Sequence, residues 1–163
     1  MRLFVLAAGL TLTLDQASKL WVIHALDLPR RLAIDVVPPF LNFRMAWNTG
    51  VNFGLFAGES EVTRWVLVAL ALAISAWVWV WVSRQPPRGL VHVSAGLLVG
   101  GALGNAIDRL AYGAVADFIN MSCCGIANPF AFNIADVAIF AGAIGLVLFS
   151  GDGDGDGARD KTP

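Results

Sequence analysis

Charged residues are scarce in this chain. Only 14% of its 163 residues are Asp, Glu, Lys or Arg, whereas 57% are hydrophobic. An ordinary soluble domain carries about a quarter charged residues. The polar groups are too few to cover a globule in water, and a lipid bilayer is the solvent that suits the surplus apolar surface. The composition therefore predicts an integral membrane protein, and the length fits a single domain.

Residues that bind metals or nucleic acids are also few. Eleven basic and twelve acidic residues give a net charge of −1, and no basic stripe indicates a nucleic-acid partner. His24 and His92 stand alone, so no set of zinc ligands is evident. Cys123 and Cys124 are adjacent, and a disulfide between neighbours is strained, so the pair says little about redox compartment. We expect neither a metal nor another cofactor.

Four apolar segments are each long enough to cross a bilayer, which takes about 20 helical residues. They run over about 3–24, 62–82, 91–110 and 130–149. The predicted fold is an all-α membrane protein with four transmembrane helices. Asp15 and Lys19 interrupt the first segment and no small-residue cleavage site follows it, so we expect this segment to stay attached as a span.

The distribution of basic residues predicts the orientation. The short loop over 83–88 contains Arg84 and Arg88, so the positive-inside rule places it in the cytoplasm together with both termini. Basic residues near the termini agree with this orientation, whereas those of the first long loop oppose it. Residues 27–61 and 111–129 are then extracytoplasmic.

Two segments outside the spans have recognisable local patterns. Residues 40–47 partly alternate apolar and polar side chains, and turn residues follow at 48–50 and Gly54, so we expect a small sheet on the membrane surface. Residues 1–150 form the membrane domain, and 151–163 form a flexible cytoplasmic tail. The tail opens like a calcium-binding EF-hand loop, but its twelfth position is Pro163 and not the bidentate Glu, so we expect no calcium site.

Several charged residues lie within or next to the apolar segments. Placing a charge there costs free energy, and such residues commonly have a function. Asp15 and Lys19 are four residues apart on one helical face and can pair. We interpret them as a pair that orients the helix and supports a site. Asn105, Asp108 and Arg109 crowd one end of the third segment, where they could equally serve helix packing and anchoring. Upstream glycines allow close helix approach, namely Gly100, Gly101 and Gly104.

Asp117 and Asp136 are the strongest candidates for chemistry. They flank a turn-rich loop between the third and fourth segments, so an antiparallel hairpin brings both carboxylates to one membrane face. Two nearby carboxylates cannot both ionise easily, and they share a proton. One can then act as a base on water while the other donates to a scissile carbonyl. No serine of the chain has a partnered base in a recognisable motif.

Other functions are compatible with parts of this pattern. A transporter or proton channel could use Asp15, Asp108 and Asp136 as a relay, but it predicts polar residues across the whole bilayer depth, and here they cluster towards one face. A presenilin-like protease needs a G-x-G-D segment within a span, and none of the four predicted spans contains one. A catalytically inactive assembly protein of the same fold remains open.

Five motifs in order give the chain a resemblance to the lipoprotein signal peptidase family, also called signal peptidase II. The segment from Asp15 to Lys19 resembles D-Q-x-x-K, and residues 48–54 resemble N-x-G-x-A-F-G. Residues 100–109 resemble G-G-x-x-G-N-x-x-D-R. The last two, over 115–118 and 132–136, resemble V-x-D-F and F-N-x-A-D. The resemblance extends over nearly the whole chain from the first span to the fourth.

The resemblance implies an aspartic endopeptidase of the bacterial inner membrane. Such an enzyme removes the signal peptide of a prolipoprotein by cutting just before the diacylglyceryl-modified cysteine, at a site that opens to the outer face. It implies that Asp117 and Asp136 are catalytic. Supporting positions fall on Asp15, Lys19, Asn48, Gly50, Asn105, Asp108, Arg109 and Asn133. Membrane lipid and globomycin-type inhibitors are the other expected partners, and we expect a monomer.

One position departs from the family pattern. Asn52 stands where the family usually has a small residue before Phe-Gly, so substrate preference or rate could differ. The resemblance implies no role for Cys123 and Cys124.

Overall fold

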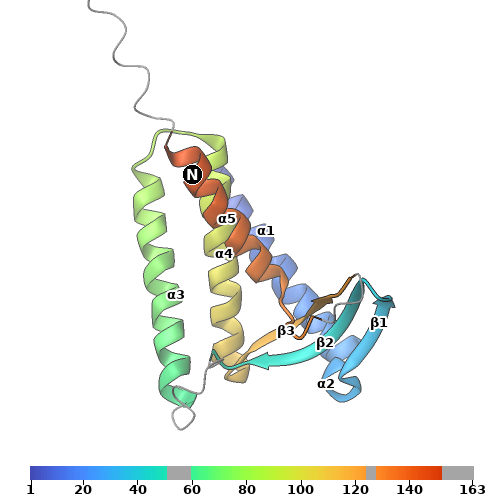
Figure 1. Ribbon diagram of the computed structural model, residues 1–163. Helices are drawn as coiled ribbons and strands as arrows, with labels where there is room; N and C mark the ends of the chain where they lie inside the picture. The colour runs from blue at the N-terminus through green and yellow to red at the C-terminus, as the bar shows by residue number, and fades with distance from the viewer. Residues whose placement is uncertain (51–59, 124–127, 152–163) are drawn as a thin grey trace, which may run out of the picture.

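The computed structural model describes residues 1–50, 60–123 and 128–151. The interpretations that concern Asn52, Gly54, Cys124 and the tail after Gly151 lie outside these residues. Long helices lie side by side, and a small sheet projects from one end of the bundle (Figure 1).

Three helices in the described ranges are long and apolar enough to cross a membrane. The first comprises α1 (Arg2–Leu20) and a π-helical turn, η1 (Trp21–Ala25). The others are α3 (Ser60–Ser83) and α4 (Gly89–Tyr112). The short helix α2 (Leu28–Arg31) follows η1.

The fourth apolar segment forms a shorter helix, α5 (Ile134–Ser150), of 17 residues. At about 1.5 Å per residue its length is about 25 Å, somewhat less than the roughly 30 Å hydrocarbon core of a bilayer. The sequence places this segment from about 130, whereas the helix starts at Ile134. It starts there because Asn133 caps it and Phe132 instead pairs with Ile119 of the sheet.

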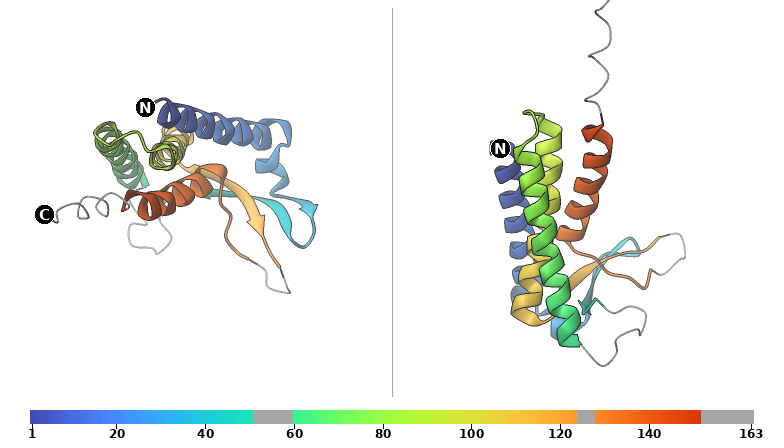
Figure 2. Two further views of the ribbon diagram at one scale, coloured as in Figure 1. Left: turned by 90° about the horizontal axis from the view of Figure 1, so that it is seen from above. Right: turned by 90° about the vertical axis from the view of Figure 1, so that its left-hand side faces the viewer.

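Helix α4 lies at the centre of the bundle, with α1 and α5 on either side and α3 alongside (Figure 2). The predicted close approach at the glycines is confirmed. A Cβ atom added to Gly100 would lie 2.5 Å from the carbonyl oxygen of Ala8, and one at Gly101 would lie 2.5 Å from that of Ala135. The glycines thus bring the backbones of α1 and α5 directly against α4.

Large apolar side chains cover the outside of the bundle. Leu6 is 67% exposed, Trp77 67%, Phe140 70% and Val147 79%. Such a surface is costly in water and favourable against lipid tails. It supports the membrane location that composition predicts.

A three-stranded antiparallel sheet has the order β1-β2-β3, formed by β1 (Ala33–Val37), β2 (Leu41–Asn48) and β3 (Val115–Met121). The predicted strand over 40–47 is confirmed as β2, and the small sheet is confirmed with it. Strand β3 was not predicted. It joins the residues after α4 to the first loop, and Ala46 of β2 pairs with Asp117 of β3.

Candidate active site

Asp117 and Asp136 lie where the sheet meets the bundle. Asp117 is the third residue of β3 and its side chain is buried, whereas Asp136 is the third residue of α5 and is half-buried. The predicted hairpin does bring the two residues together, but one carboxylate projects from a strand and the other from the first turn of a helix.

Asn133 joins the two carboxylates. Its side-chain Nδ2 donates to Oδ1 of Asp117 at 2.6 Å. Its backbone N–H donates to Oδ2 of Asp136 at 3.2 Å, and its Oδ1 accepts from the backbone N–H of Asp136 at 2.9 Å. The last two bonds form a reciprocal cap of α5. The cap that starts the helix therefore also positions both acids.

Asn48 holds the other oxygen of Asp117. Its Nδ2 donates to Asp117 Oδ2 at 3.1 Å, while its own Oδ1 accepts from the backbone N–H of Gly50 at 2.9 Å. Gly50 has a φ of +84°, a left-handed conformation that favours glycine. Gly50 thus sets the turn that orients the amide of Asn48.

Asn105 of α4 makes the corresponding contact to Asp136. Its Nδ2 donates to Asp136 Oδ1 at 2.9 Å. Its Oδ1 accepts from Lys19 Nζ at 3.0 Å and from Asn133 Nδ2 at 3.2 Å. The amide is buried and hydrogen-bonds both Lys19 and Asp136, so it links the position of Lys19 to that of the carboxylate.

Lys19 forms a buried ion-pair cluster with two acids. Its Nζ lies 2.8 Å from Asp15 Oδ2 and 2.8 Å from Asp108 Oδ2. All three side chains are almost completely shielded from solvent. The predicted pairing of Asp15 with Lys19 is confirmed, and the structure adds Asp108 as a second partner.

The two acids of this cluster also hold the backbone beside the candidate catalytic residues. Asp15 Oδ1 accepts from the N–H of Ala135 at 2.9 Å, directly before Asp136. Asp108 Oδ2 accepts from the N–H of Ala116 at 3.1 Å, directly before Asp117. One buried lysine thus controls, through two acids, the backbone positions of both carboxylates.

Gln16 is a contributor that the site prediction missed. Its Nε2 donates to Asp108 Oδ1 at 2.9 Å, to Asp15 Oδ2 at 3.2 Å and to the carbonyl of Gly104 at 3.2 Å. Its place in the second position of the Asp15 motif was the available signal. A Cβ atom at Gly104 would lie 2.6 Å from Asp15 Oδ2, so this glycine makes room for the cluster.

Arg109 lies close to the pair without bonding to it. Its Nη1 donates to the carbonyl of Asn105 at 3.3 Å, and its charge interacts with those of Asp117 and Asp136. No partner for its Nε is found in the part of the chain that the structure describes. The guanidinium therefore supplies a positive charge near both acids and retains donor capacity.

Burial, and after it the neighbouring charge of Asp136, raise the pKa of Asp117 from 3.8 to about 6. Hydrogen bonds from Asn48 and Asn133 and the charge of Lys19 oppose this rise. A carboxyl group with such a pKa exchanges its proton near neutral pH, which suits acid–base chemistry. Within the described residues, no group of three His, Cys, Asp or Glu is arranged to hold a metal ion.

Known proteins are similar to this chain over most of its length. Residues 7–150 match the family model for signal peptidase (SPase) II. A lipoprotein signal peptidase of Methylorubrum extorquens (strain PA1) is 49% identical over 144 residues, which cover 86% of this chain and 80% of that protein. One from Rhodopseudomonas palustris (strain TIE-1) is 40% identical over 152 residues, covering 91% and 92%.

Solved structures are similar as well. One is described as a bacterial membrane enzyme determined by the in meso method at 1.9 Å resolution. It superposes with a TM-score of 0.76 at 27% identity, covering 92% of this chain and 93% of that one. A second, determined by the same method at 2.3 Å, has a TM-score of 0.75 at 27% identity and covers 98% and 93%.

Proposed function

The chain belongs to the signal peptidase II family, and from this premise we propose that Asp117 and Asp136 are its catalytic pair. The family is that of the lipoprotein signal peptidases, aspartic peptidases that cleave signal peptides from prolipoproteins, and this chain is such a membrane-embedded hydrolase. The observation that carries the assignment of the pair is the double contact of Asn133, which binds Asp117 at 2.6 Å and Asp136 at 3.2 Å.

In the proposed mechanism the two carboxyl groups share one proton and hold a water molecule. The ionised group takes a proton from the water as its oxygen attacks the scissile carbonyl carbon. The protonated group donates a hydrogen bond to the developing oxyanion. When the C–N bond breaks, a proton passes to the leaving amine, and the pair is again singly protonated. No covalent intermediate is required.

The supporting residues act by holding the two carboxylates and the adjacent backbone in place. Asn48, Asn105 and Asn133 present N–H donors to carboxylate oxygens, which stabilises the ionised state that must act as the base. Asp15, Lys19 and Asp108 lie one layer further away and hold the backbone on which the pair is mounted. Arg109 places a positive charge where the substrate carbonyl develops negative charge.

We propose that α1, α3, α4 and α5 all cross the inner membrane, with both termini and the tail over 151–163 in the cytoplasm and 1–150 as the membrane domain. The start of α1 and the end of α5 lie at the same end of the bundle, opposite the sheet (Figure 1). The loop that contains Arg84 and Arg88 lies at that end too, which agrees with the positive-inside rule. The sheet and both carboxylates then face the outer side.

This placement fits a lipid-modified substrate. The diacylglyceryl chains of the prolipoprotein would remain in the bilayer beside the helices, so the scissile bond is held at the membrane face where the carboxylates lie. Anchoring of this kind removes much of the entropic barrier. Globomycin-type inhibitors would compete for the same place, and the chain would act as a monomer, since one copy contains all the residues of the proposed site.

The test is cleavage of a lipidated prolipoprotein by the purified protein. Asp117→Asn and Asp136→Asn each remove the shared proton site, and we expect either change to lower the rate at least about 10³-fold. Asp35→Asn is the matched control, because Asp35 is an exposed carboxylate on β1 of the same sheet. Thermal unfolding of each variant checks that it is folded. Substantial cleavage by either folded variant would rule out the pair.

A further inference from the structure

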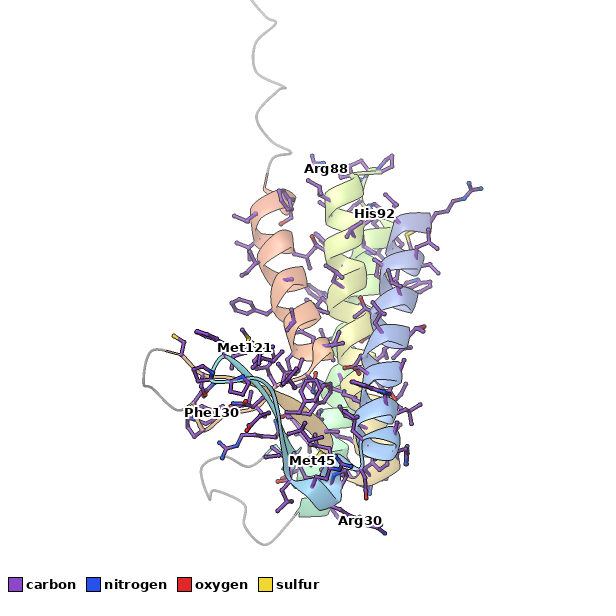
Figure 3. The ribbon with its side chains drawn as sticks, turned by 90° about the vertical axis from the view of Figure 1, so that its right-hand side faces the viewer. Arg30, Met45, Arg88, His92, Met121 and Phe130 are labelled. Carbon is purple, nitrogen blue, oxygen red and sulfur yellow. The ribbon has the colours of Figure 1, made fainter. Side chains whose placement is uncertain are left out.

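Basic residues gather around a cavity at the end of the bundle away from the sheet. A cavity of about 260 Å³ opens where α1 and α4 both begin, and its lining includes Arg2, Arg88, Gly89 and His92. Figure 3 shows Arg88 and His92 at this end, far from Met45 and Met121 of the sheet. One water needs only about 15 Å³ of such space, so the cavity accommodates a much larger ligand.

The cavity is lined by positive charge that no acidic side chain balances. Two guanidinium groups line it and no carboxylate does. Neither Arg2 nor Arg88 forms an ion pair within the described residues. The start of α4 adds backbone N–H groups that no side chain caps. These features together favour an anion.

The buried side chain of His92 forms part of the cavity wall. The side chain is only 4% exposed, and its Nδ1 lies 2.8 Å from the carbonyl oxygen of Arg88. A carbonyl can only accept, so Nδ1 carries the hydrogen. In this tautomer Nε2 is an acceptor. Over the described ranges no partner is found for it, so it can accept from a hydroxyl group of a lipid headgroup in the cavity that His92 lines.

The position of the cavity at the start of two membrane spans favours a lipid as the source of the anion. The spans of α1 with η1 and of α4 each have 24 residues, which is about 36 Å against a hydrocarbon core of about 30 Å. Arg2 and Gly89 are the first residues of these two spans, so in the proposed topology they would lie near the level of the lipid phosphates. Leu3 and Leu90 beside them are exposed at 49% and 59% and offer an apolar surface to acyl chains.

We propose that this Arg2–Arg88 cavity binds the phosphate of an anionic phospholipid whose acyl chains lie along the outside of α1 and α4. Basic pockets between membrane helices bind anionic headgroups in this way. The site is separate from the carboxylate pair, so it neither requires nor tests the peptidase assignment.

The experiment measures lipid adducts of the delipidated full-length protein by native mass spectrometry. Phosphatidylglycerol is the probe, phosphatidylcholine is the uncharged comparison and inorganic phosphate is the competitor. Each arginine near a membrane surface contributes about fivefold in affinity, so we expect Arg2→Gln with Arg88→Gln to weaken phosphatidylglycerol binding about 30-fold. Arg84→Gln is the matched control, since Arg84 is exposed in the same loop and does not line the cavity.

Selective binding of phosphatidylglycerol that falls in the double variant and not in the control supports the proposal. Equal loss in Arg84→Gln, or equal binding of phosphatidylcholine, overturns it. Displacement by inorganic phosphate at the same concentration overturns the lipid source. A large gain in affinity on deleting 152–163, which contain four aspartates, overturns it in favour of the tail as occupant. Peptidase activity reports folding of the double variant, and Arg2→Gln alone, with about a fivefold loss expected, serves if that variant does not fold.

Discussion

At the scale of single residues, Asn133 combines a structural role with a proposed role in positioning the carboxylates. As the N-cap of α5 it accepts from the backbone of Asp136, and with the other end of its amide it donates to Asp117. These functions use different atoms of one side chain. They can therefore be separated by substitution.

Serine at this position tests the separation. Asn133→Ser retains a good N-cap but has no N–H to reach Asp117, whereas Asn133→Ala loses both contacts. We expect Asn133→Ala to lower stability by about 1 kcal/mol more than serine does. Both variants should lower kcat by at least about tenfold. Thermal unfolding and prolipoprotein cleavage measure the two effects, and a serine variant with full activity contradicts the role assigned to the amide.

Asp117 predicts a pH dependence. Its pKa lies at about 6 in the folded protein, above its ordinary value of 3.8, chiefly because of burial and then because of Asp136. The folded state binds this proton more tightly than the unfolded chain, so the stability contribution of Asp117 is fully present below pH 3.8 and is lost as pH rises through about 6.

The same ionisation removes the shared proton that the mechanism needs. We expect kcat/KM, which reports the free enzyme, to fall as pH rises through about 6. The stability of Asp117→Asn relative to the parent should rise by up to about 3 kcal/mol between acid and pH 8. A flat profile of kcat/KM from acid to alkaline pH, or a stability difference between the two proteins that does not change with pH, speaks against this assignment.

At the scale of elements, the contact between α4 and α5 determines where Asp136 lies. Gly101 packs so closely against α5 that the carbonyl oxygen of Ala135 occupies the space that a Cβ atom would need. Ala135 is the residue before Asp136. The position of α5 against α4 therefore determines the position of Asp136 through a contact between the two backbones alone. Neither Gly101 nor Ala135 has a side chain that could take part in the reaction.

An added methyl group tests this coupling. In Gly101→Ala the new Cβ would lie 2.5 Å from the carbonyl oxygen of Ala135, so α5 must shift. We expect a loss of about 1–3 kcal/mol in stability and a fall in kcat. Gly9→Ala is the matched control on α1, because no atom lies within 4 Å of its added Cβ. It should raise stability by up to about 1 kcal/mol, and equal effects of the two changes would contradict the packing argument.

At the scale of the whole molecule, Lys19 and its two acids link the membrane bundle to the site. Lys19 and Asp15 come from α1, Asp108 from α4, and the N–H groups that the acids hold belong to β3 and α5. Removing Lys19 would leave two buried carboxylates without a counter-charge, which is strongly destabilising. The cluster thereby makes the position of the carboxylates depend on the assembly of the bundle.

Local pattern in the sequence was sufficient for several features. Continuous apolar runs located the helices, alternation located β2, and Asp15 with Lys19 four residues later predicted a pair. These succeed because helical and strand periods involve neighbours in sequence only. The five ordered motifs likewise placed Asp117, Asp136 and their supporting residues.

Only the tertiary structure decided how these residues act together. Strand β3 escaped prediction because it is stabilised by pairing with β2, about 70 positions earlier in the chain. The bonds of Asp15 to Ala135 and of Lys19 to Asn105 span 120 and 86 positions, and no local period encodes them. The sequence by itself determined the long apolar helices and the membrane location and singled out the two candidate acids, whereas the arrangement proposed to share a proton depends on contacts that exist only once the bundle has closed.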